Sequence, residues 1–247
     1  MDVELVRAKS TVGSPLLGIG AFLGVYALFD VLPIILPKSD VIHGLRWGDL
    51  VDAPLAFLLV AAYVLLGLQA GLWRSNRLRV VNAVALVLLV QGHGIHLAAN
   101  TISAYLDPSS PGWRPAYFLD EHWGHLELQL GILLAALIFI VAARNNAETL
   151  SPLTRIPLVL LACTYGLFLT ADAIEGQTVP LMVPAGVTLA LVGFLPRRPF
   201  SVYRSFFASA FATTVLALAA YGLWHGGFPE HDWHVWQYIL VTPGRCC

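Results

Sequence analysis

Charged side chains are scarce in this sequence. Lysine, arginine, aspartate and glutamate make up 12% of its 247 residues, whereas hydrophobic residues make up 57%. Soluble domains carry about 25% charged residues, so this chain has roughly half the charge that a water-exposed surface of its size requires. The mean hydropathy of +0.73 agrees with that shortage. The composition therefore predicts an integral membrane protein.

Cysteine pairs and a surplus of positive charge are also lacking. The three cysteines, Cys163, Cys246 and Cys247, are not spaced as a disulfide framework or as a C-x-x-C metal site. Fourteen basic residues stand against fifteen acidic ones, which gives a net charge of −1. Such a chain lacks the basic surface that binds nucleic acid. We expect no nucleic-acid partner, and we expect membrane lipids to surround a fold held together by helix packing.

Long apolar runs are abundant. About 20 residues at 1.5 Å per residue cross a bilayer core of about 30 Å, so runs of that length are expected to be transmembrane helices. Seven such runs cover approximately residues 14–37, 51–73, 80–106, 119–143, 156–173, 179–195 and 205–224. The sequence predicts an all-α, seven-transmembrane helix bundle that forms a single domain over residues 1–247. Residues 225–247 are expected to lie along the outer membrane interface.

The positions of the basic residues predict the orientation of this bundle. Ten of them fall at the N-terminus and in alternate connections: Arg7, Lys9, Arg74, Arg77, Arg79, Arg144, Arg155, Arg197, Arg198 and Arg204. The other side receives Lys38, Arg46, Arg114 and Arg245. Because basic residues stay on the cytoplasmic side, we expect a cytoplasmic N-terminus and an external C-terminus, in a plasma or inner membrane.

Histidines gather on the outer side of this predicted topology. None of the eight lies on the cytoplasmic side, and six form the H-x-x-H pairs His93/His96, His122/His125 and His231/His234. This spacing places both imidazoles on one side of a helix. Ionisable groups within apolar runs are costly and are functional candidates by default. His93, His96 and His125 fall within such runs and therefore need partners.

Residues from the first two of these pairs, together with Glu121, can form a metal site. A turn of 100° per residue places His93 and His96 on one face of the third helix, and Glu121 and His125 on one arc of the fourth. A short outer connection makes these helices antiparallel neighbours, so the two faces can meet. Three imidazoles and a carboxylate suit zinc or another divalent transition metal. We expect the three histidines to be ligands, and Glu121 to be the fourth ligand or the general base.

Further polar residues at the same depth are expected to support the site. Asp120 is a second candidate for the base that acts on metal-bound water. The fifth helix ends with Asp172 and Glu175, where the helix dipole disfavours acids and a nearby cation is expected. The residues expected to support the ligands or to contact the substrate are Asn100, His122, Asp172, Glu175 and His225.

Simpler interpretations remain open for several polar residues. A single histidine at a helix end can hydrogen-bond to a carbonyl group or to water at the interface, which is the interpretation favoured for His43, His231 and His234. Asp49 and Asp52 precede Pro54 and are expected to cap the second helix. Asp120 could cap the fourth helix in the same way.

The expected function is metal-dependent hydrolysis of a lipid or another amphiphile at the outer membrane face. Metal-activated water would attack a carbonyl or phosphoryl group, and a site at the membrane edge would give acyl chains access from lipid. The sequence does not determine the oligomeric state.

Two other functions remain open. The first is a haem- or iron-binding redox protein, in which Gly92, Gly94 and Gly124 leave room for the porphyrin of haem b between the third and fourth helices. The second is a cation or proton transporter. The inner halves of the third, fourth and seventh helices are almost wholly apolar, which favours a one-sided site over a conduit.

The architecture resembles the superfamily of alkaline ceramidases and adiponectin receptors, which are zinc-dependent membrane hydrolases with seven helices, intramembrane histidines and an acid. The last helix departs from that pattern, because it offers only His225 where the family carries H-x-x-x-H. The histidine pairs here lie instead on the third and fourth helices. The resemblance therefore assigns no role to any residue of this chain.

Overall fold

The computed structural model describes residues 14–37, 39–42, 45–143, 152–195 and 201–228. Six helices in these ranges are long and apolar enough to cross a membrane, and a seventh apolar helix is shorter. The helices are α1 (Pro15–Ile35), α2 (Trp47–Gln69), α3 (Asn76–Ser103), α4 (Trp113–Phe118), η1 (Leu119–Gly124), α5 (His125–Ala142), α6 (Pro152–Glu175), α7 (Val179–Phe194) and α8 (Val202–His225). A small hairpin of β1 (Asp40–Ile42) and β2 (Leu45–Arg46) joins α1 to α2. This architecture agrees with the expected all-α membrane bundle.

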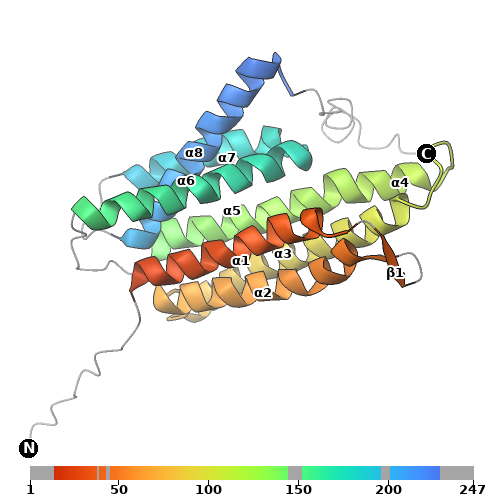
Figure 1. The fold of residues 1–247 in the computed structure, drawn as a ribbon. Helices are drawn as coiled ribbons and strands as arrows, with labels where there is room; N and C mark the ends of the chain where they lie inside the picture. The colour runs from red at the N-terminus through yellow and green to blue at the C-terminus, as the bar shows by residue number, and fades with distance from the viewer. Residues whose placement is uncertain (1–13, 38, 43–44, 144–151, 196–200, 229–247) are drawn as a thin grey trace, which may run out of the picture.

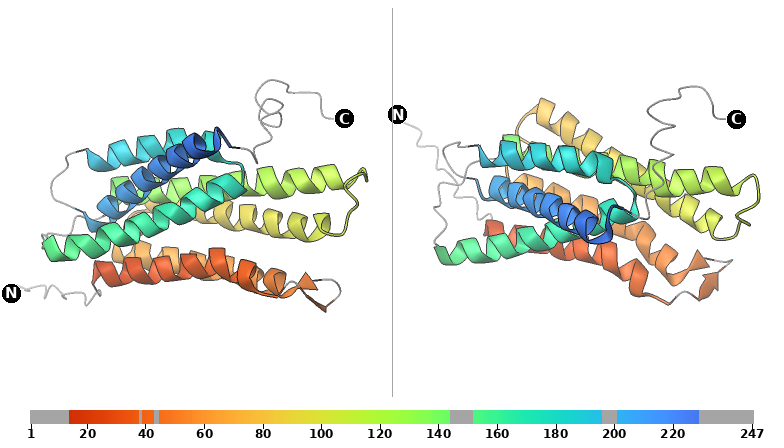
Figure 2. Two further views of the ribbon diagram at one scale, coloured as in Figure 1. Left: turned by 45° about the horizontal axis from the view of Figure 1, so that its top comes forward. Right: turned by 90° about the horizontal axis from the view of Figure 1, so that it is seen from above.

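Most of the helices run side by side along one long axis, and α8 crosses them at an angle (Figure 1). The segments α4, η1 and α5 follow one another without a break and form one rod, so they count as a single crossing. The main packing pairs are α1 with α2, α3 with α5, and both α6 and α7 with α8. Figure 2 shows α1 and α2 on one side of the bundle, α6, α7 and α8 on the other, and α5 between them.

Local sequence signals explain where the second helix, α2, begins and ends. The second helix begins at Trp47, before the expected start at Val51, because the Asp49 carboxylate accepts a hydrogen bond of 2.9 Å from the Arg46 backbone. It ends at Gln69, since Gly71 adopts a left-handed φ of 71° that stops the helix.

Glycines allow α3 to pack directly on the η1–α5 rod. A Cβ atom at Gly131 would lie 2.6 Å from the Leu89 amide nitrogen, and one at Gly124 would lie 2.7 Å from the His96 amide nitrogen. A Cβ atom at Gly92 would clash with the Leu128 amide nitrogen. The two backbones therefore meet without intervening side chains, and this close approach determines how near the histidines of α3 and α5 can come.

Aromatic side chains fill the middle of the bundle. The cluster consists of Phe22, Tyr26, Phe139, Tyr165, Phe206 and Phe207, all fully or almost fully buried. Tyr26 and Tyr165 pack with ring centroids 4.8 Å apart, and Phe139 and Phe207 with centroids 4.7 Å apart. This cluster, contributed by α1, α5, α6 and α8, makes the middle of the bundle aromatic.

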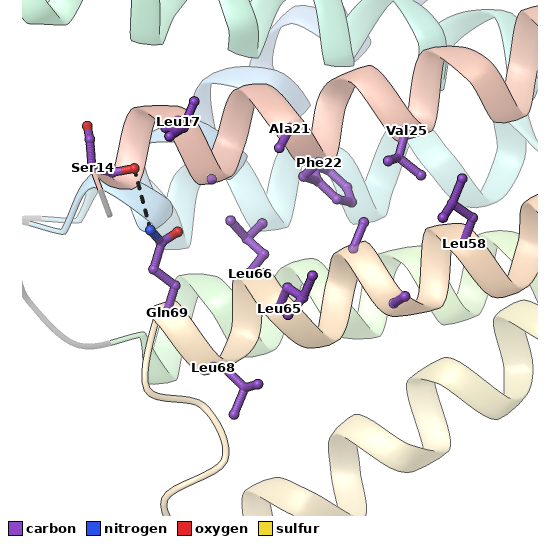
Figure 3. A pocket seen from close by; sticks show the side chains of 13 residues that line it. Ser14, Leu17, Ala21, Phe22, Val25, Leu58, Leu65, Leu66, Leu68 and Gln69 are labelled. Atoms are coloured by element: carbon purple, nitrogen blue, oxygen red, sulfur yellow. Dashed lines mark hydrogen bonds between the residues drawn. The ribbon is translucent and has the colours of Figure 1, made fainter. Parts of the chain in front are cut away.

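An apolar groove of about 520 Å³ lies between α1 and α2 toward the other end of these helices (Figure 3). Leucine, alanine and phenylalanine side chains form most of its wall. At its end, the Gln69 amide donates a hydrogen bond of 3.4 Å to the Ser14 carbonyl oxygen. The groove is thus chemically unlike the polar cavity described next.

Candidate functional site

A cavity of about 410 Å³ opens at the end of the bundle where α1 and α6 finish and α2 and α5 begin. Apolar residues of α1, among them Val31 and Ile34, form part of its wall. The polar and ionisable residues of its lining are Asp30, Arg46, Asp49, Asp52, His93, His96, Asn100, His125, Asp172 and Glu175. Side chains from α1, α2, α3, α5 and α6 therefore share one polar space within an apolar bundle.

Asp120 orients the imidazole of His96. The Nδ1 atom of His96 lies 2.7 Å from the Oδ1 atom of Asp120, which is 4% exposed. A carboxylate at one ring nitrogen fixes the tautomer and the orientation of a histidine, and leaves the other nitrogen to act as ligand or base. The candidate base Asp120 is thus placed behind His96, outside the cavity lining.

His125 lies beside His96 and has no hydrogen-bond partner for either ring nitrogen among the described residues. It is 6% exposed, and its ring centroid is 4.4 Å from that of His96. Gly176 makes room for it, because a Cβ atom there would clash with the His125 ring. A buried imidazole without a partner is costly, so His125 is the clearest sign that this cavity accommodates a ligand or water.

His93 pairs with Asp52 on the neighbouring helix. The Nε2 atom of His93 lies 3.4 Å from Asp52 Oδ1 and 3.4 Å from the Asp52 backbone oxygen. The ring of Phe29 packs on His93 with centroids 4.8 Å apart. Asp52 lies in the second turn of α2, beyond the capping positions, so the expectation that it caps this helix is wrong. Asp49 does cap the N-terminus of α2, as expected, because its carboxylate accepts the hydrogen bond from the Arg46 backbone.

A group of carboxyl side chains lies on the α1 and α6 sides of the cavity: Asp30, Asp172 and Glu175. The buried Tyr26 hydroxyl donates a hydrogen bond of 2.6 Å to Asp172 Oδ2. The Oδ2 atom of Asp30 is buried and has no hydrogen-bond partner in the described part of the chain. We refer to these three acids as the carboxyl wall.

The structure does not bring every predicted site residue to the cavity. Asn100 is part of the lining, but Glu121 and His122 are not. The ring of His122 instead contacts those of Tyr117 and Phe118. His225 also lies outside the lining and packs against Tyr221 with ring centroids 4.3 Å apart and the rings tilted. His43, His231 and His234, which were expected to form hydrogen bonds at the interface, lie outside the described residues.

The contacts around the histidines are pairwise. Within the described ranges, no three histidine, cysteine, aspartate or glutamate side chains lie close enough together to hold a metal ion. Ligation of one ion by His93, His96 and His125 would therefore require rotation of these side chains.

Gly92 and Gly124 do not provide space for a porphyrin, although Gly94 faces open space. The positions of Cβ atoms at Gly92 and Gly124 are already taken by the facing backbone. His96 and His125 are in ring contact, which leaves no gap for a macrocycle between them. This packing disfavours the arrangement of haem between α3 and α5.

Comparisons with known proteins identify no relative. The chain matches no protein-family model, and neither a curated protein nor a solved structure is detectably similar to it. The functional inference therefore rests on the chemistry of the cavity.

Proposed function

We propose that this protein is a metal-dependent membrane hydrolase, of the zinc type, that acts on a lipid or another amphiphile in the cavity. The observation that carries the proposal is the convergence of His93, His96 and His125 on one buried polar space. Neutral imidazoles are ligands for zinc and other divalent transition metals. Three protein ligands leave one coordination position for water.

The neighbouring carboxylates support this assignment. Asp120 holds His96 as a carboxylate holds a metal-binding histidine in known zinc sites. Asp52 lies in the cavity lining, whereas Glu121 does not. We therefore assign to Asp52 the role first expected of Glu121, that of fourth ligand or general base. A bound metal would supply activated water and a polarised carbonyl or phosphoryl oxygen.

The reaction needs a substrate that reaches the cavity from lipid. Ile34 and Val31 are exposed on the outer surface of α1 and also contribute to the cavity wall. An acyl chain could follow this apolar edge while its polar group enters the cavity. The distribution of lysine and arginine favours an external position for this end of the bundle, in a plasma or inner membrane.

The metal content of the purified protein tests the proposal. Elemental analysis of the wild type should find about one transition-metal ion per chain, and His96→Ala or His125→Ala should reduce it severalfold. His122→Ala is the matched control, because His122 is buried in the same region but lies outside the cavity lining. Wild-type protein without metal, or equal metal content in all variants, would overturn the proposal.

The transporter alternative has less support. A conduit needs polar groups that continue across the membrane. The aromatic cluster around Tyr165 and Phe207 fills the bundle interior between the cavity and the other end.

The absorption spectrum of the purified protein distinguishes the haem alternative from the proposed hydrolase, because only a haem protein would show a Soret band.

A further inference from the structure

The two sides of the cavity differ in chemistry. Imidazoles of α3 and α5 form one side, and the carboxyl wall of Asp30, Asp172 and Glu175 forms the other. The proposed hydrolysis uses the imidazole side and leaves the carboxyl wall without a role. Ionised acidic side chains within a membrane bundle are costly unless a partner such as a cation accompanies them.

The protein itself does not supply that cation within the described residues. Arg46 is the one lysine or arginine of the cavity lining among the described residues, and its guanidinium binds Asp49, with Nε 3.1 Å from Oδ2 and a terminal nitrogen 2.9 Å from Oδ1. None of the acids of the carboxyl wall forms an ion pair with a described lysine or arginine. The donor seen on Asp172 is the neutral Tyr26 hydroxyl.

A second observation points independently to a ligand in this space. His125, which faces the same cavity, is more than nine-tenths buried and has both ring nitrogens without a hydrogen-bond partner. Asp30 Oδ2 is also buried without a partner. Buried polar groups in native proteins are normally satisfied, so both groups indicate that the cavity is occupied when the protein works.

The geometry points to an amphiphile with a primary ammonium group as the molecule that occupies this cavity, with the ammonium group bound by Asp30, Asp172 and Glu175. This inference rests on the proposed function for the reaction, because the bond to be cleaved would lie toward the histidines. An ammonium group carries three N–H donors and one positive charge, which suits several carboxyl oxygens on two helices. The volume of about 410 Å³ is within the range of small-molecule sites and exceeds the space that one ion needs.

The apolar part of the cavity lining indicates that the rest of the ligand, beyond its ammonium group, is apolar. Phe29, Phe168 and Ile34 belong to the cavity lining and lie on α1 and α6, the helices that carry the carboxyl wall. The α1 edge is exposed toward the surroundings of the bundle, which in a membrane are acyl chains. A single apolar chain attached to the amine would therefore extend along α1 into lipid.

Binding of dodecylamine to the purified full-length protein in lipid nanodiscs tests this inference. Dodecanol serves as the uncharged probe of equal chain length, and EDTA-treated protein is used so that a resident metal does not contribute. We expect dodecylamine to bind about tenfold more tightly than dodecanol, as a charge-assisted hydrogen bond predicts. Glu175→Gln and Asp30→Asn should remove this preference, whereas Asp107→Asn, which changes an exposed acid outside the cavity, should retain it.

The outcomes separate this inference from the proposed function. Equal affinity for the amine and the alcohol in the wild type would overturn the inference, as would an amine preference that survives both carboxyl-wall substitutions. The Glu175 variant keeps this test valid if the Asp30 variant does not fold, because Glu175 is exposed and accepts glutamine without loss of packing. An amine preference in a protein that binds no metal would contradict the hydrolase and leave the amine site standing. Bound metal without an amine preference would contradict the amine site and leave the proposed hydrolase standing.

Discussion

Asp120 and His125 are five residues apart in sequence, yet both lie against His96. Asp120 Oδ1 is 2.7 Å from His96 Nδ1, and the His125 ring centroid is 4.4 Å from that of His96. In an α-helix, five positions at about 100° each would place them about 140° apart. The chain between them is the π-helical turn η1, whose i→i+5 hydrogen bonds bring residues five apart toward one face.

This relationship predicts that deletion of Trp123 is tolerated. Trp123 is 40% exposed in η1, and its removal would convert the wide turn to an α-helix with Asp120 four positions before His125, still on one face. Metal content and the unfolding midpoint should stay close to those of the wild type. Deletion of Leu130, an exposed residue of regular α5, should instead abolish metal binding, since it rotates the preceding residues by about 100°. Equal effects of the two deletions would contradict this account.

The close packing of α3 and α5 predicts opposite effects for two glycine substitutions. Gly131→Ala places a methyl group 2.6 Å from the Leu89 amide nitrogen and should lower the free energy of unfolding by about 1–3 kcal/mol. Gly94→Ala meets nothing within 4 Å and should be neutral or stabilising by up to about 1 kcal/mol through helix propensity. Unfolding in mixed micelles measures both, and a neutral Gly131 variant would show that the helices can separate at low cost.

The hydrogen bond from Tyr26 to Asp172 predicts a large effect for removal of one hydroxyl. Tyr26→Phe leaves Asp172 Oδ2 without its 2.6 Å donor and should destabilise the protein by about 1.5–3 kcal/mol if the carboxylate is ionised. Tyr63→Phe is the control, because its hydroxyl is 3.4 Å from that of Tyr165 and both groups are neutral. A smaller loss, about 0.5–1.5 kcal/mol, is expected there. Equal losses would argue against a charged Asp172.

The distribution of basic residues predicts the side on which the cavity opens. A reporter that is active only outside the cytoplasm should be active when fused after Arg245 and silent when fused after Arg77. The same reporter fused after Ser109, in the connection between α3 and α4, should be active. The reverse pattern would place the cavity on the cytoplasmic side.

Composition and apolar length alone determined the helical architecture. The seven runs were recognisable because lipid requires about 20 consecutive apolar residues for each crossing. Helices lie at all seven positions, six of them long enough to span and α7 shorter. The spacing of His93 and His96 also identified one side of the cavity, since residues three apart on a regular helix share a face. These are local properties, and neighbouring helices change them little.

Tertiary structure decided which carboxylate meets which histidine. Regular helical geometry favoured Glu121, but η1 changes the rotation between Asp120 and His125 and turns Asp120 toward His96. Asp52 resembled a helix cap until the packing of α2 against α3 placed it beside His93. His225 has the expected position along its helix, yet the C-terminal end of α8 projects away from the other helices (Figure 1). Depth in the membrane follows from position along a helix, whereas proximity across the bundle depends on turn type, glycine contacts and helix crossing, which no single segment encodes.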